Sequence, residues 1–333
     1  MKIEDILNKR YATRSMSDKD FETNLQTFAD QLTSVDYKPS YEEAALNKDW
    51  KALCKFNCSG MKTINSTSRI GMKLCEHFFP NFWDIKSKKH GSFNDKWQDT
   101  ELLKKVLIWN RRCHSTPYLS ELKRGIYFCS GMTKSTMYRP QLAKCVTYGA
   151  KTVFDPCAGW GGRLLGSVAN GAKYYAFEPN TKTFDNLNRM VDFLGIRDRV
   201  QLINDDVLNI KEYDLPPMDM CITSPPYFDL EIYTDEETQS VNNTKTYSDW
   251  VDHFLAPTIT NCIELLTDNG VSCWNVAKCG KDDMWEDTTR VHNENNFYQT
   301  DQFIISSSRR QANQNSSKNQ KSTDKTIVFS RPT

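Results

Sequence analysis

Five residues, Thr-Ser-Pro-Pro-Tyr at 223–227, combine groups that could hold a flat, polar ligand. Pro225 and Pro226 have no backbone N–H, so they end the preceding apolar run and form a stiff ledge where a strand stops. Ser224 and the Pro225 carbonyl offer hydrogen-bond acceptors in fixed directions, and Tyr227 offers an aromatic face. The segment therefore predicts a stiff polar ledge at the end of a strand, and a structural turn is the alternative interpretation.

A second candidate site is the segment Asp-Pro-Cys-Ala-Gly-Trp-Gly-Gly at 155–162. Glycines between a strand and a helix permit a tight turn and allow a ligand to approach the main chain. A P-loop is excluded, because no phosphate-binding Lys-Ser/Thr pair follows the glycines. The carboxylate of Asp155 disfavours a pyrophosphate and favours a ligand with a positive end, such as an amino acid or a sulfonium.

Two further acidic residues follow predicted strands. Glu178 comes 19 residues after Gly159, a spacing at which a carboxylate can accept both hydroxyls of a ribose. By itself Glu178 could equally be a surface acid, and the glycines favour the ribose interpretation. Asp206 could accept a hydrogen bond from an adenine amino group, although Asp in this position is also common as a helix cap or turn residue.

All of these polar residues lie at the carboxyl ends of predicted strands. Alternating strands and helices from about residue 150 predict an α/β fold, a Rossmann-like doubly wound sheet of seven mostly parallel strands. Ligands bind outside the carboxyl ends of the strands in such sheets, so the polar residues should meet at one edge. The predicted strands are 150–156, 173–179, 199–205, 218–224, 270–277, 302–307 and 326–330, with amphipathic helices at 163–170 and 181–194 and another from Ser248 or Asp249 that Pro257 kinks or restarts.

Composition places the chain among ordinary globular proteins. It has 333 residues, of which 38% are hydrophobic and 26% charged, with a net charge of +1. No apolar run approaches the roughly 20 residues that span a bilayer, and the first residues lack the pattern of a secretory signal. Eleven cysteines occur without a C-x-x-C pair, which is typical of reduced thiols in a cytosol-like compartment. We therefore expect a cytoplasmic protein with no membrane partner.

The motifs, in this order, resemble those of the class I S-adenosylmethionine-dependent amino-methyltransferases of DNA. The resemblance covers about 135–330 and lies in VFDPCAGWGGRLLG, YAFEPN, NDDV and TSPPY, with MYRPQLAKCV before them. It implies S-adenosyl-L-methionine as the cofactor and no metal. The cofactor-binding residues it implies are Arg139, Asp155, Ala158, Gly159, Trp160, Gly161, Glu178, Pro179, Asp206 and Val207. Its catalytic residues are Ser224, Pro225, Pro226 and Tyr227, and this chain departs from the family pattern at Trp160 and Arg163.

The implied reaction transfers a methyl group to the exocyclic amine of a base flipped out of DNA. Ser224 and the Pro225 carbonyl would grip the two amine hydrogens while the base stacks on Tyr227. Serine as the first motif residue slightly favours cytosine N4 over adenine N6. Two alternatives remain: methylation of an RNA base or a protein glutamine amide in the same pocket, and a catalytically inactive nucleic-acid-binding module.

Two other patterns could carry chemistry but fit poorly. Pro156-Cys157 resembles the nucleophile of cytosine-C5 enzymes, yet it follows the first predicted strand rather than the fourth. A zinc site could draw on Cys54, Cys58, Cys75 and His77, but their spacing is irregular for zinc.

The N-terminal region is the candidate for DNA recognition. Residues 61–125 hold 13 basic residues against six acidic ones, interleaved with aromatics such as Trp97 and Trp109. This composition suits a phosphate backbone and exposed bases, and it equally suits a helical domain with an aromatic core. We expect a mainly helical domain at 1–130 and the methyltransferase domain at 131–333. Loop 228–247 would cover the flipped base, and the polar loop 306–325 could close over a polyanion or be a solvated hairpin.

Overall fold

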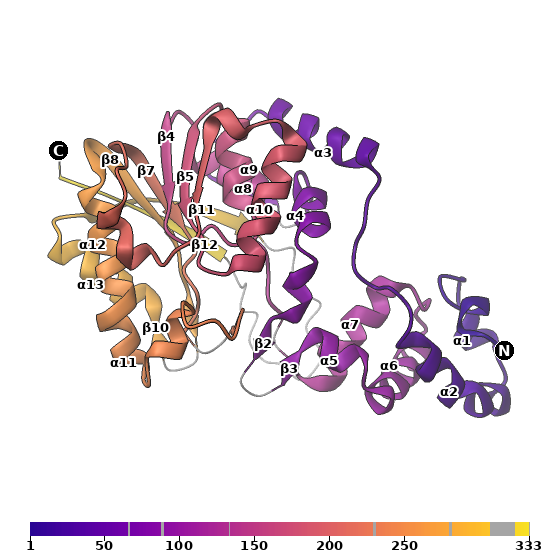
Figure 1. The fold of residues 1–333 in the computed structure, drawn as a ribbon. Coiled ribbons are helices and arrows are strands. Elements are labelled where there is room, and N and C mark those ends of the chain that lie inside the picture. The colour runs from indigo at the N-terminus through magenta and orange to yellow at the C-terminus, as the bar shows by residue number, and fades with distance from the viewer. Residues whose placement is uncertain are drawn as a thin grey trace. The chain divides into compact units, whose positions relative to one another are not determined.

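The computed structural model describes residues 1–65, 67–87, 90–132, 134–228, 231–279, 282–306 and 324–332. Its centre is an eight-stranded sheet in the order β1-β11-β12-β8-β7-β4-β5-β6 (Figure 1). Neighbouring strands pair in parallel except at β12, which runs antiparallel to both β11 and β8. The strands are β1 (Thr63–Asn65), β4 (Thr152–Asp155), β5 (Lys173–Phe177), β6 (Val200–Ile203), β7 (Met218–Thr223), β8 (Leu266–Asn275), β11 (Tyr298–Ser306) and β12 (Asp324–Ser330).

The doubly wound α/β prediction is confirmed, and each of the seven predicted strands is present. The eighth strand, β1, comes from the N-terminal region and pairs in parallel with β11, with Thr63 opposite Ile304. Only Ile64 of its three residues is buried. Three residues with one buried side chain carry too little alternation to be predicted as a strand from sequence.

Successive strand residues point to opposite sides of the sheet, so both faces carry apolar side chains. Helices cover both of these faces. On β4, Val153 packs into one hydrophobic cluster and Phe154 into the other. The first face is covered by α3 (Glu43–Lys55), α4 (Met72–Phe78), α8 (Pro140–Val146), α9 (Gly162–Ala169) and α10 (Thr181–Leu194), and the second by α12 (Ala256–Glu264) and α13 (Met284–Glu294).

The helical run after the Ser-Pro-Pro-Tyr segment begins slightly earlier than predicted. Helix α11 (Tyr247–Trp250) is capped by Thr246, whose hydroxyl accepts from the Asp249 N–H at 3.1 Å. A π-helical turn (Val251–Leu255) follows, and α12 then begins with Pro257 in its first turn. Since proline lacks the N–H of a regular helical hydrogen bond, the wider turn before it accommodates the interruption. The predicted restart near Pro257 is confirmed.

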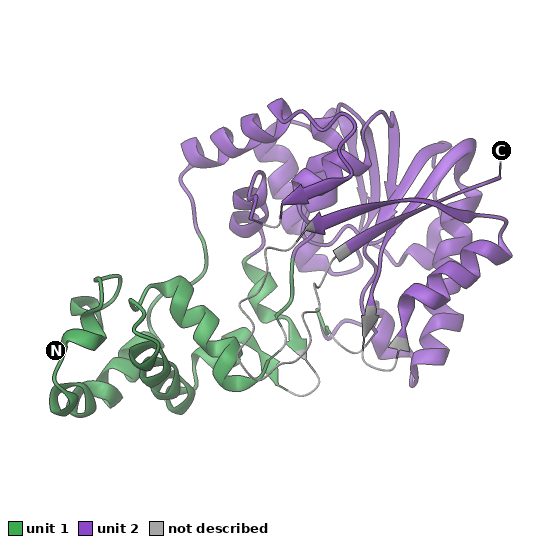
Figure 2. Cartoon of the chain, turned by 180° about the vertical axis from the view of Figure 1, so that it is seen from behind, with its two compact units in different colours: residues 1–39, 80–136, 229–233 green, residues 40–79, 137–228, 234–333 purple. Residues whose placement is uncertain are grey.

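The chain forms two compact units (Figure 2). Unit 1 comprises 1–39, 80–136 and 229–233, and unit 2 comprises 40–79, 137–228 and 234–333. The division differs from a single boundary near residue 130, because segment 40–79 packs with the sheet. In unit 1 the helices are α1 (Ala12–Ser15), α2 (Asp18–Leu32), α5 (Phe93–Trp97), α6 (Thr100–Arg112) and α7 (Leu119–Ser130), with the short strands β2 (Lys86–Ser87) and β3 (Gly91–Ser92).

Segment 40–79 is held to the sheet unit by a buried lysine. The Lys144 ammonium donates to the carbonyls of Leu53 (2.8 Å) and Cys54 (2.7 Å) in the last turn of α3. A cation at the negative end of a helix dipole satisfies carbonyls that have no intrahelical partner. The remaining short elements are β9 (Lys278–Cys279), β10 (Asp282–Asp283), and single turns at Ile3–Asp5, Pro80–Asp84, Arg197–Arg199, Val207–Glu212 and Ser240–Asn243. Among the described helices, none is long and apolar enough to cross a bilayer.

Candidate functional site

The glycine turn and the proline ledge leave the sheet at the same edge. Strands β4 and β7 are parallel neighbours, with Val153 opposite Met220 and Phe154 opposite Cys221. Strand β5 lies on the other side of β4, so the chain reverses its direction of progress across the sheet between β4 and β7. The crevice outside such a reversal point is where open α/β sheets bind ligands.

The glycines of the turn meet two different requirements. Gly159 (φ +56°) and Gly161 (φ +71°) occupy the left-handed region that other residues rarely adopt. A Cβ on Gly161 would also lie 2.5 Å from Met190 Cε, and one on Gly162 would lie 2.0 Å from the Tyr138 carbonyl oxygen. A Cβ on Gly159, by contrast, would make only ordinary contacts, the nearest at 3.7 Å to the Cys157 carbonyl oxygen, so its positive φ alone requires glycine there.

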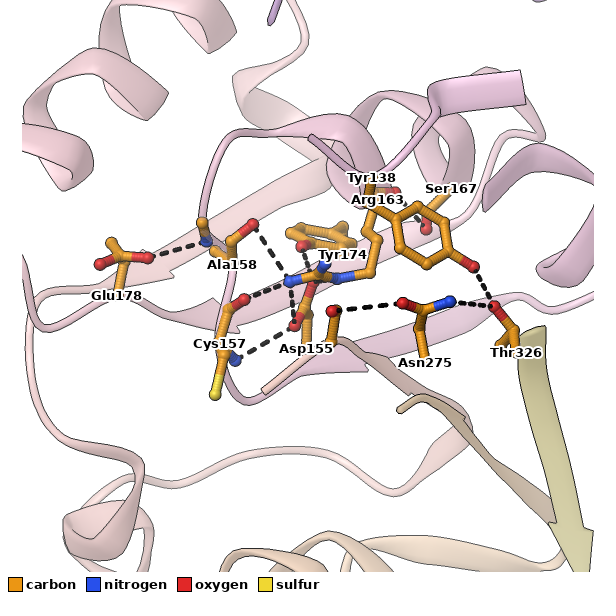
Figure 3. Close-up of polar contacts among 12 residues, drawn as sticks. Tyr138, Asp155, Cys157, Ala158, Arg163, Ser167, Tyr174, Glu178, Asn275 and Thr326 are labelled. Carbon is orange, nitrogen blue, oxygen red and sulfur yellow. Dashed lines mark hydrogen bonds and ion pairs between the residues drawn. The ribbon is translucent and has the colours of Figure 1, made fainter. Parts of the chain in front are cut away.

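Asp155 is fully buried and paired with Arg163 (Figure 3). Its carboxylate accepts from Arg163 Nε at 2.6 Å, from the Tyr174 hydroxyl at 2.6 Å and from the Cys157 N–H at 3.1 Å. Burial alone would lower the pKa of Arg163, but Asp155 raises it above its ordinary value. The arginine guanidinium also donates to the Cys157 carbonyl and reaches the Ala158 carbonyl at 3.4 Å. Arg163, an outlier in the family pattern, therefore neutralises Asp155 and fastens the turn.

Trp160, the other outlier, has a partner from the N-terminal segment. Its ring lies edge-to-face with Phe79, with centroids 6.0 Å apart. Phe79 is fully buried and also contacts the position where a Gly161 side chain would project. Segment 40–79 therefore forms one wall of the glycine turn.

Glu178 lies at the end of β5 and is only 7% exposed. Its carboxylate accepts from the Gly159 N–H at 2.8 Å and from the Asn180 N–H at 3.0 Å. Burial raises the pKa of Glu178 to about 7, although these two N–H groups lower it. The structure thus brings the acid and the glycine turn, which the sequence predicted as one site, into direct contact.

The other predicted cofactor-binding residues serve local structure around this point. Asp206 caps a short turn by accepting from the Leu208 N–H at 3.0 Å, and burial raises the pKa of Asp206. Val207 is buried in the second-face cluster. The Ala158 N–H donates to the Phe177 carbonyl at 2.9 Å, and Arg139 donates to the Ser68 carbonyl. Pro179 continues the chain after Glu178, where its carbonyl accepts from Thr238 at 3.4 Å.

The ledge residues converge on Asn275 at the end of β8. Ser224 Oγ donates to Asn275 Oδ1 at 3.5 Å, and the Tyr227 hydroxyl donates to the Asn275 carbonyl at 3.5 Å. Pro225 is buried and Pro226 half-buried, so the ledge is packed on one side. These contacts tie the first and last of the four predicted catalytic residues to Asn275, one through its side chain and the other through its main chain.

Asn275 links the ledge to the glycine turn (Figure 3). Its Nδ2 donates to the Lys325 carbonyl at 3.0 Å and reaches Thr326 Oγ1 at 3.5 Å. The Thr326 hydroxyl lies 2.7 Å from the Tyr138 hydroxyl, and the Arg163 guanidinium lies 5.4 Å from the Tyr138 ring centroid. A continuous series of contacts therefore joins Asp155 to Ser224.

Sequence reasoning missed Asn275, although a signal was available. Asn275 ends a predicted strand, as Asp155, Glu178 and Ser224 do or nearly do, and β8 runs parallel to β7. Applying the same strand-end rule to the fifth strand would have found it. Thr326 carries no such signal, because it lies near the start of the antiparallel strand β12 and faces Asn275 only through their pairing.

The loop predicted at 228–247 lies by Glu178 in its described part. Glu236 accepts from the Thr181 hydroxyl at 3.2 Å, and Thr238 contacts Pro179 as above. The Trp250 Nε1–H donates to Ser240 at 3.0 Å and ties the loop to the following helix. The loop therefore reaches the strand end that carries the predicted ribose acid. The predicted polar loop 306–325 lies almost entirely outside the described residues.

The structure supports neither a Cys157 nucleophile nor a zinc site among the N-terminal cysteines. Burial raises the pKa of the Cys157 thiol well above its ordinary value, and Asp155 raises it further, which keeps the thiol protonated. Cys58 donates its S–H to the Lys144 carbonyl at 3.4 Å. Across the described residues, no group of three or more His, Cys, Asp or Glu side chains could hold a metal ion.

Comparison with known proteins finds likeness in fold alone. No family model and no curated protein matches the chain. TrmN from Thermus thermophilus is 13% identical over 58% of this chain (TM-score 0.41), and this chain spans 49% of TrmN. An S-adenosylmethionine-dependent O-methyltransferase from Thermotoga maritima is 13% identical, and the match covers 60% of this chain and 68% of that enzyme (TM-score 0.41). Precorrin-6y C5,15-methyltransferase from Geobacter metallireducens is 12% identical, and the match covers 60% of this chain and 92% of that enzyme (TM-score 0.39).

Replacing Arg163 by methionine should destabilise the fold strongly, because it leaves the Asp155 carboxylate buried without a counter-charge. We expect the free energy of unfolding in urea to fall by about 3–5 kcal/mol. The exposed pair Arg197–Asp192 (2.7 Å) is the control, since Arg197→Met should cost less than about 1 kcal/mol. Adding Asp155→Asn to Arg163→Met should recover part of the loss. A loss below 1 kcal/mol for Arg163→Met would show that the pair does not hold the turn.

Proposed function

We propose that this protein is an S-adenosylmethionine-dependent methyltransferase that modifies the exocyclic amine of a DNA base, with cytosine N4 slightly favoured over adenine N6. One observation carries the proposal: the glycine turn with its acid and the Ser-Pro-Pro-Tyr ledge follow neighbouring parallel strands at the reversal point of the sheet. A methyl donor and an acceptor amine need such adjacency, because the reaction is an in-line displacement that depends on positioning.

The residues of the turn fit the proposed cofactor. Gly159 adopts a left-handed conformation with its N–H on Glu178, and the Glu178 carboxylate could accept the ribose hydroxyls once it is ionised. Asp206 and Val207 follow the next strand, β6, where they would contact the adenine. When bound, S-adenosylmethionine supplies an electrophilic methyl group on a sulfonium. Because Arg163 already neutralises Asp155, we assign Asp155 to holding the turn that receives the cofactor's methionine part.

The ledge can act on an amine because of how Asn275 orients Ser224. The serine hydrogen is directed at Asn275 Oδ1, which leaves the Ser224 lone pairs facing away to accept from the substrate. Together with the Pro225 carbonyl, they would hold both amine hydrogens as the nitrogen becomes tetrahedral and nucleophilic. The nitrogen would then form the N–CH₃ bond with the methyl group that the cofactor supplies, as the methyl–sulfur bond breaks and a thioether leaves, and one amine proton would pass to solvent.

Tyr227 would hold the target base by stacking. A base within a duplex cannot reach a ledge at a sheet edge, so it would be flipped out of the helix. The half-buried Tyr227 ring packs against the second-face hydrophobic cluster, as Cys157 of the glycine turn also does. A base stacked on its other side would lie over the ledge, at the sheet edge from which the glycine turn also leaves.

The two alternatives use the same residues. An RNA base or a protein glutamine amide presents a similar planar amine, and some of the structures with a similar fold carry provisional descriptions as RNA methylases. The Ser-first ledge mildly favours DNA over these. A nucleic-acid-binding module without activity would not require the acid, glycines and ledge to meet at one edge.

A methyl-transfer assay tests the proposal directly. Purified protein would be incubated with S-adenosylmethionine labelled in its methyl group and with DNA, RNA or protein pools. We expect label in DNA, followed by N4-methylcytosine or N6-methyladenine on nucleoside digestion and mass spectrometry. Label only in RNA or protein would replace DNA by that substrate, and no transfer with tight cofactor binding would refute the catalytic role.

Tyr227→Ala should abolish most turnover while leaving cofactor binding intact. Loss of one base-stacking contact costs about 1–3 kcal/mol, so we expect kcat/KM to fall roughly 5- to 150-fold. Isothermal titration with S-adenosylmethionine should give a Kd within twofold of the wild type. Tyr227→Phe, which keeps the ring, is the matched control and should retain most activity. Equal activity of the alanine variant would remove Tyr227 from the base site.

Cofactor affinity should depend on pH through Glu178. The folded protein holds this carboxyl at a pKa of about 7, above its ordinary value, and ribose hydroxyls donate best to the ionised form. The Kd for S-adenosylmethionine should therefore fall several-fold as pH rises from 6 to 8. Glu178→Gln should weaken binding by about 1–3 kcal/mol and remove this pH dependence. Glu212→Gln, at an exposed acid, is the control, and an unchanged Kd in the Glu178 variant would exclude it from the site.

Asn275→Leu should lower kcat by acting through Ser224. Without the amide oxygen, the Ser224 hydroxyl could turn its hydrogen toward the substrate amine. In that orientation the Ser224 oxygen could no longer accept a hydrogen bond from the amine N–H. We expect kcat to fall at least tenfold, with cofactor Kd unchanged. In a double-mutant cycle with Ser224→Ala, the second substitution should add little. Full additivity of the two losses would show that Asn275 serves only the packing of β8 against β12.

A further inference from the structure

Most aromatic residues of the basic N-terminal stretch are core residues. Phe78, Phe79, Phe93 and Trp97 are buried, and the Trp83 ring packs edge-on against Phe93 at 4.8 Å. The core interpretation therefore holds for these side chains. They are unavailable to a nucleic acid, which confines any aromatic contact of this region to what remains at the surface.

Many of the cations are engaged as well. Arg111 donates to the Met16 carbonyl (2.8 Å) and pairs with Asp18, and Lys123 donates to the Tyr37 carbonyl at 3.1 Å. Lys104 pairs with Glu101 on its own helix. Net charge along the sequence therefore overstates the positive surface of unit 1.

One surface of unit 1 has both aromatic rings and cations available at the surface. We name Lys105, Trp109 and Arg112 of α6 with Arg124 and Phe128 of α7 the α6–α7 patch. Phe128 is 61% exposed, level with Met1 as the most exposed large apolar side chain, and its ring lies 5.5 Å from Trp109 at an angle of 33°. The Arg124 guanidinium lies 5.2 Å from the Trp109 ring centroid. The exposed Phe128 ring therefore lies beside a half-buried Trp109 ring that carries a cation on its face.

The packing of the two helices holds this pair at the surface. A Cβ on Gly125 would lie 2.7 Å from Val106 and 3.0 Å from the Trp109 ring, so α7 approaches α6 closely at this point. Trp109 is thereby supported on one side while Phe128 projects from the next turn of α7. Rigid aromatic rings lose little conformational entropy when they bind a partner.

The charges around the pair are mainly positive. Lys105 and Arg112 flank Trp109 on α6 at helical spacings of four and three residues, are exposed, and form no ion pair within the described part of the chain. Arg124 pairs with Glu121 at 2.7 Å but keeps 61% of its side chain exposed. The cations therefore outnumber the acidic group that faces them.

We propose that the α6–α7 patch binds single-stranded DNA, with an unpaired base stacked on Phe128 and Trp109 and the neighbouring phosphates on Lys105 and Arg112. This inference rests on the proposed DNA substrate and adds a second contact surface, in unit 1, to the site in unit 2. Bases inside a duplex have no open face for an exposed ring, whereas an unpaired base does. A nucleic acid would engage the rings and the two cations together, through its bases and its phosphates.

Binding of a fluorescent thymidine 20-mer, followed by anisotropy at several salt concentrations, tests the patch. We expect Phe128→Ala and Trp109→Ala each to raise the Kd about tenfold. The variant Lys105→Gln/Arg112→Gln should lower the slope of log Kd against log salt by about 1.4, as two lost phosphate contacts require for a single strand. Tyr118→Ala, at a 45% exposed aromatic of the same unit, is the control and should bind as the wild type does.

The outcomes separate the patch from the active site. Because Phe128 is mostly exposed, its alanine variant should keep the wild-type thermal transition and the wild-type Kd for S-adenosylmethionine. Undiminished oligonucleotide binding by both alanine variants would overturn the patch, even if methyl transfer to DNA is observed. Weakened binding with no methyl transfer by the wild type would support the patch and refute the proposed function. If Phe128→Ala and Trp109→Ala weaken the binding of duplex DNA or RNA more than that of the 20-mer, the assignment of single-stranded DNA to the patch is overturned.

Discussion

The buried ion pair between Asp155 and Arg163 is the interaction on which the candidate site depends. Asp155 ends β4, and Arg163 lies in the first turn of α9, so the pair joins the two ends of the glycine turn. The same guanidinium reaches two turn carbonyls and lies against the Tyr138 ring, which joins three chain segments at one charged group. Taking two charges out of water is unfavourable unless their hydrogen bonds are satisfied, and here the Tyr174 hydroxyl and the Cys157 N–H complete the set. Specific turn geometry, rather than added stability, is what such a pair provides.

Asn275 has a comparable role on the acceptor side. Its amide can present its oxygen to Ser224 because its nitrogen is held by the β12 backbone, in a sheet pairing that places Thr326 directly opposite. The antiparallel strand thus determines which way a hydroxyl on a parallel strand points. Since Tyr138 contacts both Thr326 and Arg163, the turn and the ledge share one rigid support. In the proposed reaction, precise positioning of the donor and acceptor groups would be the main source of rate.

The N-terminal residues divide between two physical roles. Segment 40–79 is part of the sheet unit: it contributes β1, packs Phe79 against Trp160, and is anchored by Lys144. The helices of unit 1 enclose a separate core and leave Phe128 outside it. Residues of similar composition therefore support the turn in one case and remain at the surface in the other. Composition cannot distinguish these roles, because it does not report which face of a helix has a neighbour.

The sequence by itself determined the fold class, the seven main strands and the strand-end placement of Glu178 and Ser224, because two-residue and 3.6-residue periodicities are local properties. It could also identify the glycine turn, since left-handed backbone and close packing both exclude other residues. Only the tertiary structure decided that Arg163 neutralises Asp155 and that Thr326 orients Asn275. Such pairings join residues that are adjacent through strand order and helix packing, which no local pattern encodes.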